Sequence, residues 1–487
     1  MQQPTGSLRE ERGPTRSGEV SIELRGVGQV GADARYGTAG RLLSMWVKMN
    51  PSMFFVGALV GAPFIGLGLG PAILAIVIAN VMGATITGVF ATFGPRTGVP
   101  QLQQSRLSFG RFAWLPASLQ WVTQIGFEAL TLLFVAEALS VLFNVPFYVG
   151  AVVGLVCMGV ISLLGYEVIH SFQKVMVVVF FILFAALTIA ILGKGPHLVQ
   201  TSHGGAAVGG FLLFVAIALG IALFCTSASD YSRYLPESTS SMKVVFAVAI
   251  SLFVSMTWIE LLGVLASSML RGSSTMQGVY NVVGGGAVGA VAMIAMALGA
   301  ISIMVLTDYS GALAAQAAGV HLLRPIITVI SALIAFGVAV WLYSGNVSGR
   351  FEDVLLLISY WVTPWAAIVL VYWVREGGAL SRERMTSIFS APLGSLQSGV
   401  AAPVALVVGF LAALPFSDTG LDATISGAIP GLGWLFGGVS RGFLQGGDLD
   451  FYVGFVVAGG VYWLLRAIEG SRVPAEESPN VEVTTTR

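Results

Sequence analysis

Residues 214–236 read FVAIALGIALFCTSASDYSRYLP, an apolar run in which Gly220 is followed by small and hydroxyl side chains. Residues 57–71 read GALVGAPFIGLGLGP and place five glycines and two prolines in a second apolar run. Glycine lowers the cost of an unwound backbone, and unwinding inside a membrane is tolerated only where it lines a cavity. The two runs therefore predict two discontinuous membrane helices. Glycine also allows close helix packing, which either run alone would equally fit.

The composition identifies a membrane protein with many spans. Hydrophobic residues make up 56% of the 487 residues and charged residues only 10%. An apolar stretch of about 20 residues crosses the hydrocarbon core as a helix, because lipid offers no partner to an unpaired backbone group. The fold class is therefore all-α and polytopic. Twelve spans are predicted: 50–71, 74–93, 114–143, 147–168, 173–193, 208–229, 243–270, 286–319, 325–344, 352–374, 400–416 and 450–468.

The two glycine-rich runs lie in the first and sixth spans, five spans apart. This separation is typical of two five-helix repeats with inverted topology, whose broken helices meet at a site near the membrane midplane. The glycine-rich stretch 417–449 is expected to be re-entrant or interfacial. The predicted organisation is a tail (1–45), a ten-helix core (46–375) with repeats at about 46–195 and 206–375, two peripheral helices (376–469) and a second tail (470–487).

The distribution of basic residues predicts the orientation. With the N-terminus in the cytosol, the outer loops contain only Lys194, Arg271, Arg350 and Arg441, which leaves 20 of the 24 basic residues inside. Cytoplasmic loops are enriched in Lys and Arg. We therefore expect a multi-pass plasma-membrane protein with both tails cytosolic.

Several function classes are disfavoured. The formal charge is zero, which gives no electrostatic argument for a nucleic-acid partner. The two cysteines lie in apolar segments and the four histidines are not at metal-ligand spacing, so neither a metal nor a cofactor is expected. An intramembrane enzyme would need a nucleophile–base pair or metal ligands facing a cavity, and paired broken helices favour a transporter over an open channel. The oligomeric state cannot be predicted.

Five segments together resemble the nucleobase–cation symporter family 1, the purine–cytosine permease-like transporters. They are the loop GPRTGVPQLQQSRLSFGRFAWLP at 94–116, SASDYSRYLP at 227–236, TDYSGALAAQAAG at 307–319, FEDVLLLISYWVTPWAAI at 351–368 and GGDLDFYVGFVVAGGVYWLL at 446–465. The resemblance covers roughly residues 45–468. It implies a LeuT-like fold of ten core helices plus two peripheral ones, and import of a nucleobase such as cytosine or a purine coupled to a cation gradient.

The resemblance also implies substrate contacts. The family's stacking aromatic in span three corresponds to Phe127, and its hydrogen-bonding amide corresponds to Thr131, which lacks the amide's paired donor and acceptor. The span-six pair corresponds to Gly220 and Ile221, where an aromatic is more usual, so Phe64 or Phe224 is a candidate replacement. A later contact in span eight corresponds to Ala312. These departures leave a related heterocycle as an alternative substrate: a hydantoin, allantoin or a pyrimidine vitamin precursor.

Polar residues in span three form a further group. Gln124, Phe127, Glu128 and Thr131 share one helical face because they lie three, four and seven residues apart. We expect this face to border the substrate, with Glu128 accepting N–H groups from a base edge. The alternative for Glu128 is a buried acid paired with another helix.

The coupling cation is expected to be a proton or sodium. The family's sodium site uses span-one carbonyls, here around Gly57 and Gly61, and span-eight hydroxyls, of which Thr307 remains. Asp308 follows it, and a buried carboxylate can alternate between charged and neutral forms. A proton carried by Glu128 and Asp308 is therefore favoured, although Asp308 is also explained by local pairing.

A few other intramembrane or boundary residues receive structural expectations. Asp230 and Arg233 are expected to hold the inner loop rather than to contact substrate. Glu260 in span seven is expected to pair with an unidentified polar group. Tryptophans near span ends are expected to be interfacial anchors, and these are Trp46, Trp114 and Trp373.

Overall fold

The computed structural model describes residues 26–47, 51–61, 64–163, 166–270, 275–377 and 381–470. In these residues all regular secondary structure is helical, which confirms the predicted fold class. Nine described helices are long and apolar enough to cross a membrane, and a bent pair, Ala401–Phe416 with Gly420–Ala428, adds a tenth candidate. The helix Phe147–Leu163 is apolar but shorter.

The helices follow the order of the predicted spans. They are α1 (Gly40–Trp46) with α2 (Pro51–Ala58), α3 (Leu69–Ala91), α6 (Trp114–Phe143), α7 (Phe147–Leu163), α8 (Tyr166–Gly193), α9 (Gly204–Ala222) with α10 (Ala228–Ser232), α11 (Ser241–Ala266), α13 (Gly286–Ala317), α14 (Arg324–Tyr343), α15 (Val347–Ser359) with α16 (Val362–Tyr372), α18 (Ala401–Ala413) and α21 (Asp450–Gly470). Short helices lie at the ends of the bundle: α4 (Phe93–Thr97), α5 (Arg106–Phe109), α12 (Thr275–Val282), α17 (Arg382–Ser390), α19 (Gly420–Ala428) and α20 (Gly438–Gly442).

The sixth span is broken where its sequence indicates. Helix α9 ends at Ala222, two residues after Gly220, and α10 begins at Ala228. Between them Leu223 and Phe224 leave the helical path before a single 3₁₀ turn. The hydroxyl-rich stretch therefore forms the interruption.

The first span is also discontinuous, but its predicted extent is wrong. Its helical pieces are α1 and α2, so the span starts at Gly40, inside the segment predicted as a tail. Helix α1 ends at Trp46 and the backbone of Val47 is extended, so the chain leaves the helical path before α2. Proline suits the first position of a helix because its missing N–H has no intrahelical partner there. Of the glycines in 57–71, Gly61, Gly66 and Gly68 instead lie between α2 and α3, whereas Gly57 and Gly70 lie inside these two helices.

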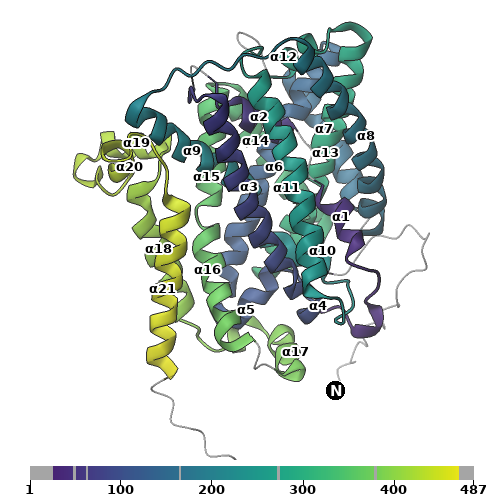
Figure 1. Cartoon of the computed structure of the whole chain (residues 1–487). Coiled ribbons are helices and arrows are strands. Elements are labelled where there is room, and N and C mark those ends of the chain that lie inside the picture. Colours follow the sequence, from purple (N-terminus) through teal and green to yellow (C-terminus); the bar gives the residue numbers. More distant parts are fainter. Residues whose placement is uncertain are drawn as a thin grey trace, which may run out of the picture.

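Helices at equivalent positions in the two repeats pack against each other. Helix α3 packs on α11 and α6 packs on α13, while α2 lies against α11. Figure 1 shows α4, α5 and α17 at one end of the bundle, where the described chain also begins, and α12, α19 and α20 toward the opposite end. We call these ends the N-terminal face and the opposite face. The broken helices lie inside this bundle, as an inverted repeat requires.

Residues 26–39, predicted as part of a polar tail, contact the N-terminal face. The Val30 N–H donates to the carbonyl of Gly98 at 2.8 Å, and the Tyr36 N–H donates to that of Tyr234 at 2.7 Å. Residues 1–25 and 471–487 of the two predicted tails lie outside the described residues.

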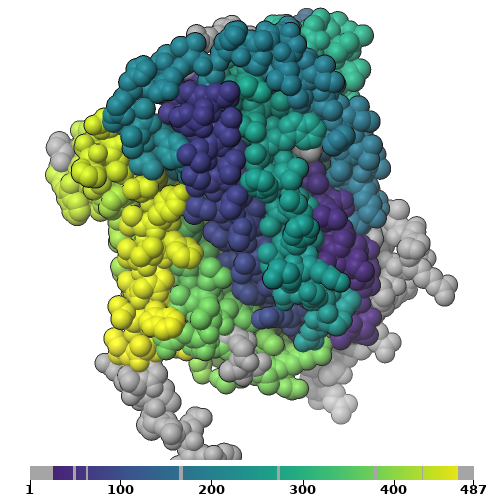
Figure 2. All heavy atoms as spheres, viewed as in Figure 1, coloured from purple at the N-terminus to yellow at the C-terminus, as the bar shows by residue number. Residues whose placement is uncertain are grey.

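The two late helices form a layer beside the core. Helix α21 packs on α18 and α16, and Figure 2 shows α21, in yellow, along the flank of the bundle. Between α18 and α21, the stretch 417–449 contains α19 and α20 at the opposite face. The chain bends by 87° between Ala401–Phe416 and Gly420–Ala428.

Candidate functional site

A small cavity lies between the two broken helices and the long helices α6 and α13. Its volume is ≈ 20 Å³, which is room for about one water molecule. A planar heterocycle would enter only if the surrounding helices moved. The cavity is lined by Ser52, Met53, Gln124, Phe127, Leu130, Thr131, Ile221, Phe224, Ile303, Thr307 and Phe351. We call this the central pocket.

Five of the predicted site residues line the central pocket. Three come from α6, at the positions whose spacing predicts a shared face, and the others come from α9 and α13: Gln124, Phe127, Thr131, Ile221 and Thr307. The Gln124 side chain makes no hydrogen bond within the described part of the chain, and its Cβ packs beside Gly311. Its amide therefore presents both a donor and an acceptor to the pocket.

The remaining lining was only partly expected. Phe224, proposed as a replacement aromatic, lines the pocket, whereas Phe64 is not among the lining residues. Ser52 and Met53 come from α2, and Phe351 from α15. The α2 residues were missed because the first break was placed after Gly57. The available signal was Asn50 followed by Pro51, because asparagine directly before a proline is typical of the start of a helix.

Glu128 and Asp308 form a second polar group behind the wall of the pocket. Glu128 is 1% exposed, and its Oε1 has no hydrogen-bond partner among the described residues. Asp308 accepts hydrogen bonds from Ser162 of α7 and, at 3.0 Å, from Thr328 of α14. The two carboxyls are close enough for their charges to interact. Neither residue is among those lining the central pocket.

Four other predicted site residues also lie outside the pocket lining. Gly220 offers its carbonyl to Ser359 at 3.4 Å, and Ala312 packs in a small apolar group with Ala315 and Ile327. Gly57 lies in α2, where a Cβ would collide with the backbone of Glu260, and Gly61 lies against Ser267. Both glycines thus have a packing reason, and the cation role proposed for their carbonyls stays a prediction.

Glu260 has a hydrogen-bonding neighbour that the sequence did not reveal. It is fully buried in α11, and Asn80 of α3 donates to its Oε2 at 2.6 Å. The Asn80 amide also donates to Thr257 at 3.1 Å. A charge-assisted or neutral carboxyl–amide bond therefore joins two helices that occupy equivalent places in the two repeats.

Between the central pocket and the N-terminal face lies an aromatic and polar layer. Asp230 accepts the N–H of Gln101 at 2.9 Å, which confirms that it holds the loop between α3 and α6. Trp46 is 0% exposed and packs edge-on against Phe224 and Tyr231, with ring centroids 6.2 and 5.4 Å apart. Its expected role as an interfacial anchor is therefore wrong: α1 carries it into the bundle.

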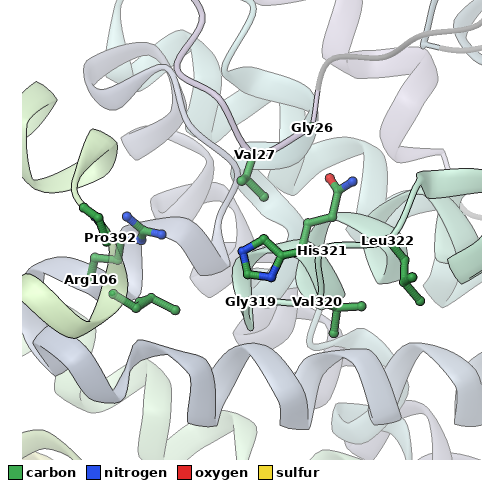
Figure 3. A pocket seen from close by; sticks show the side chains of 10 residues that line it. Gly26, Val27, Arg106, Gly319, Val320, His321, Leu322 and Pro392 are labelled. Carbon is green, nitrogen blue, oxygen red and sulfur yellow. The ribbon is translucent and has the colours of Figure 1, made fainter. Parts of the chain in front are cut away.

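A larger cavity of ≈ 490 Å³ opens at the N-terminal face. Figure 3 shows Arg106 and His321 among the side chains that line it, beneath the irregular segment that contains Gly26 and Val27. Arg106 donates to three backbone carbonyls, of Ile388, Phe389 and Ala391. The guanidinium thereby holds the end of α17. No predicted substrate or cation residue lines this cavity.

Residues 29–439 match the family model of permeases for cytosine/purines, uracil, thiamine and allantoin. The chain belongs to this permease family. The purine-cytosine permease fcyB of Emericella nidulans is 27% identical over 480 residues, covering 93% of this chain and 89% of its own. The family assignment makes the protein a transporter rather than an enzyme.

Solved structures of the transporter Mhp1 share the fold. Mhp1 of the nucleobase-cation-symport-1 family, in a closed conformation with bromovinylhydantoin bound, superposes with a TM-score of 0.67 at 16% identity, covering 93% of this permease and 97% of Mhp1. Its inward-facing conformation gives a TM-score of 0.68 at 15% identity. The LeuT-like fold implied by the resemblance is therefore confirmed.

Proposed function

We propose that this permease imports a nucleobase, such as cytosine or a purine, across the plasma membrane by alternating access. The observation that supports this most is the amide of Gln124, which makes no hydrogen bond to the described residues and lies in a pocket otherwise lined by apolar groups, aromatic rings and hydroxyls. A base edge offers adjacent donors and acceptors that an amide can match, and Phe127, Phe224 and Phe351 offer faces for stacking. The relative fcyB is a purine-cytosine permease.

A related heterocycle is the second candidate. The Mhp1 structure holds a substituted hydantoin, and the family description includes thiamine and allantoin. Hydantoins and allantoin also present amide edges to a glutamine. The phenyl rings and Met53 form a pocket wall with little hydrogen-bonding specificity, which leaves room for a ring with substituents.

The orientation that we propose places both termini in the cytosol. The N-terminal face would then be the inner face, and α12, α19 and α20 would lie outside. The 20-to-4 division of basic residues supports this assignment.

We further propose that the coupling cation is a proton held by Glu128 and Asp308. Two neighbouring carboxylates in a dry site repel each other, and an unpaired intramembrane charge is expensive. Arg324 partly offsets the charge of Asp308, whereas the charged group that acts on Glu128 is another acid. Protonation is therefore the simplest way to neutralise Glu128. Ser162 and Thr328 donate to Asp308, while Glu128 Oε1 has no donor in the described structure. This difference favours Glu128 as the group that gains the proton. Sodium is the alternative, with Thr307 as a hydroxyl ligand.

Uptake of labelled cytosine into proteoliposomes tests the function, in competition with purines, other pyrimidines, hydantoins, allantoin and thiamine. Gln124→Ala should weaken the apparent affinity for the transported compound about five- to a hundredfold, since one or two hydrogen bonds are lost from a buried edge. Gln397→Ala, at an exposed position before α18, is the matched control. If a hydantoin competes and no nucleobase does, the related heterocycle replaces the nucleobase as the proposed substrate.

Imposed gradients test the coupling ion in the same vesicles. A pH gradient alone, acid outside, should drive accumulation. Accumulation driven only by a sodium gradient, at equal internal and external pH, would contradict the proton proposal.

A further inference from the structure

Six acidic side chains gather at the opposite face, away from the central pocket and from the Glu128–Asp308 pair. They come from the start of α15, from the bend before α19 and from the start of α21. Their electrostatic influence on one another spans all three elements. The residues are Glu352, Asp353, Asp418, Asp422, Asp448 and Asp450. We call them the acidic cluster.

Asp448 is the centre of hydrogen bonding in the cluster. It is 0% exposed. Its Oδ2 accepts the hydroxyl of Tyr360 and, at 3.1 Å, the N–H of Asp418. Its Oδ1 accepts the N–H of Asp450 at 2.9 Å. Asp448 therefore joins the break between α15 and α16, the bend after α18 and the first turn of α21.

Asp450, two residues later, differs from Asp448 in its hydrogen bonding. It is also 0% exposed, yet neither of its carboxyl oxygens has a hydrogen-bond partner in the described residues. The charged groups that act on it are Asp448 and Asp422, which are both acids. The positive end of the α21 dipole favours a negative charge here, but it does not replace the missing hydrogen bonds. A buried, unpaired carboxylate beside other carboxylates must be neutralised by a cation.

Other groups around the cluster do not supply that cation. Asp422 is used as a cap, accepting from Ser417 and Thr419. Asp353 accepts the N–H of Gly420. Arg441 interacts with Asp418, but its guanidinium donates to the hydroxyl of Ser426 and to the carbonyls of Gly433 and Phe436. Tyr360 and Tyr452 are the neighbouring phenols.

A metal ion fits the geometry less well than a proton does. Hard cations need several oxygens converging on one point, and no three acidic, histidine or cysteine side chains in the described residues converge as metal ligands. Two neighbouring carboxyls, in contrast, readily share one proton and titrate as a pair. We propose that Asp448 and Asp450 form a proton-binding site at the opposite face, distinct from the central pocket, and that its proton holds the outer ends of α15 and α21 together.

The contacts of this pair reach the walls of the central pocket. Phe451, next to Asp450, packs on Gly220 of the broken helix α9 and on the ring of Tyr360, with centroids 5.4 Å apart. Ser359, next to Tyr360, donates to the carbonyl of Gly220 at 3.4 Å. On the other side of the cluster, Glu352 follows Phe351, which lines the pocket. Loss of the proton would separate α15 from α21 by like-charge repulsion and loosen both walls.

Two residues of the cluster that lie outside the spanning helices, Asp418 and Asp448, have pKa values shifted in the same direction. Burial, reinforced by Asp422, raises the pKa of Asp418 to about 6. Burial likewise raises the pKa of Asp448 from its ordinary value. A raised pKa means that the packed arrangement is favoured at low pH and weakened as pH rises through the native value. The proton site therefore favours the closed pocket when the opposite face meets acidic solution.

This inference rests on the proposed function only for the statement that the opposite face is external. Proton binding itself can be measured without transport. Purified protein in lipid nanodiscs would be titrated with acid and base while infrared difference spectra record the protonated-carboxyl C=O band. We expect Asp450→Asn to lose a titrating component of this band that Glu128→Gln retains. Glu237→Gln, which changes a half-exposed acid, should match the wild-type protein.

Tyr360→Phe provides a second variant in case Asp450→Asn does not fold. It removes the hydroxyl donated to Asp448 without changing any charge, so it should shift the frequency and midpoint of the same component. An unchanged band in either variant would overturn the site. Displacement of the component by sodium or calcium at constant pH would assign it to a metal ion instead and also overturn the proposal.

Uptake as a function of external pH separates this inference from the proposed function. Asp450→Asn fixes the site in its neutral form, so the alkaline decline of uptake should be flattened while the response to the panel of heterocycles is unchanged. If no heterocycle is transported but the infrared component depends on Asp450, the proposed function fails and the proton site stands. If transport occurs and its alkaline decline is unchanged in Asp450→Asn, the connection to the pocket is wrong.

Discussion

The hydroxyl of Thr131 donates to the carbonyl oxygen of Phe127, one turn earlier in α6, at 2.8 Å. The hydroxyl proton of Thr131 is therefore used within the helix, and its oxygen is available to the pocket only as an acceptor. The Oγ of Ser52 lies 3.5 Å from this oxygen. Thr131 consequently cannot reproduce the paired donor and acceptor of an amide. The amide in this pocket is Gln124, one turn on the other side of Phe127.

Phe127→Ala should weaken apparent substrate affinity about five- to a hundredfold. Removing an aromatic that stacks on a base costs about 1–3 kcal/mol in nucleic-acid binders. Phe127→Trp should be tolerated because it keeps a stacking face. The measurement is concentration-dependent uptake, normalised to the amount of protein in the membrane. The control is Phe181→Ala, at a side chain on α8 that is 60% exposed. Equal apparent affinities in the two alanine variants would mean that Phe127 only packs within the protein and does not contact the substrate.

Thr131→Val should have a smaller effect, about two- to tenfold. The substitution keeps the shape of the side chain and removes one acceptor, which is worth about 0.5–1.5 kcal/mol. Uptake kinetics of Thr131→Val and Gln124→Ala measured side by side would rank the two contacts. A larger loss in Thr131→Val would contradict the assignment of Gln124 as the principal polar contact.

Glu128→Gln should abolish accumulation driven by a pH gradient while preserving exchange of substrate down its own gradient. The amide mimics a permanently protonated acid, so substrate can still move but no proton cycles. Asp308→Asn should have a milder effect, since Asp308 already receives hydrogen bonds from Ser162 and Thr328. Counterflow and gradient-driven uptake in proteoliposomes distinguish the two processes. Full gradient-driven accumulation by Glu128→Gln would remove Glu128 from the coupling mechanism.

Asn80→Ala should lower the stability of the protein by about 1–3 kcal/mol, because it leaves the buried carboxyl of Glu260 without its donor. The double variant Asn80→Ala/Glu260→Gln should lose less than the sum of the single losses, since the two residues interact directly. Thermal unfolding of purified protein measures both. Asn281→Ala, at an exposed position, is the control, and strict additivity would show that the Asn80–Glu260 bond contributes little.

The break in the sixth span could be predicted from the sequence, whereas the glycines of the first span misplaced its break. In 214–236 the glycine and the hydroxyl-rich interruption are neighbours, so one signal marks both. In the first span, the glycines mark other events: Gly57 allows α2 to approach the backbone of Glu260, and Gly66 adopts φ +75 in the turn before α3. Close approach and left-handed turns need glycine as much as unwinding does.

Helical periodicity placed the α6 face correctly but could not separate Glu128 from the pocket. In a helical projection Glu128 lies on the same face as residues 124, 127 and 131. It follows Phe127 directly, however, and this offset turns it toward Asp308 rather than into the pocket. Which neighbouring helix covers each edge of a face depends on tertiary packing. The same reason separates Thr307, which lines the pocket, from Asp308. The Asp448–Tyr360 contact joins residues 88 apart in sequence and has no local signal.

Replacing Asp418 tests how the acidic cluster affects stability as a function of pH. Burial and the neighbouring Asp422 raise the pKa of Asp418 from 3.8 to about 6. This group therefore has no effect on folding below about pH 3, where it is neutral in both states. It destabilises the native state increasingly as pH rises from about 4 to about 6, and by a constant amount above that. The full loss is at most about 3 kcal/mol.

Asp418→Asn keeps the backbone N–H that donates to Asp448, so it should raise the melting temperature above pH 7 and leave it unchanged near pH 3. Melting temperatures of the wild-type protein, Asp418→Asn and the control Glu237→Gln, measured across this range in one detergent, would show the difference. A gain that is equal at both ends of the range would mean that the charge of Asp418 is not the cause.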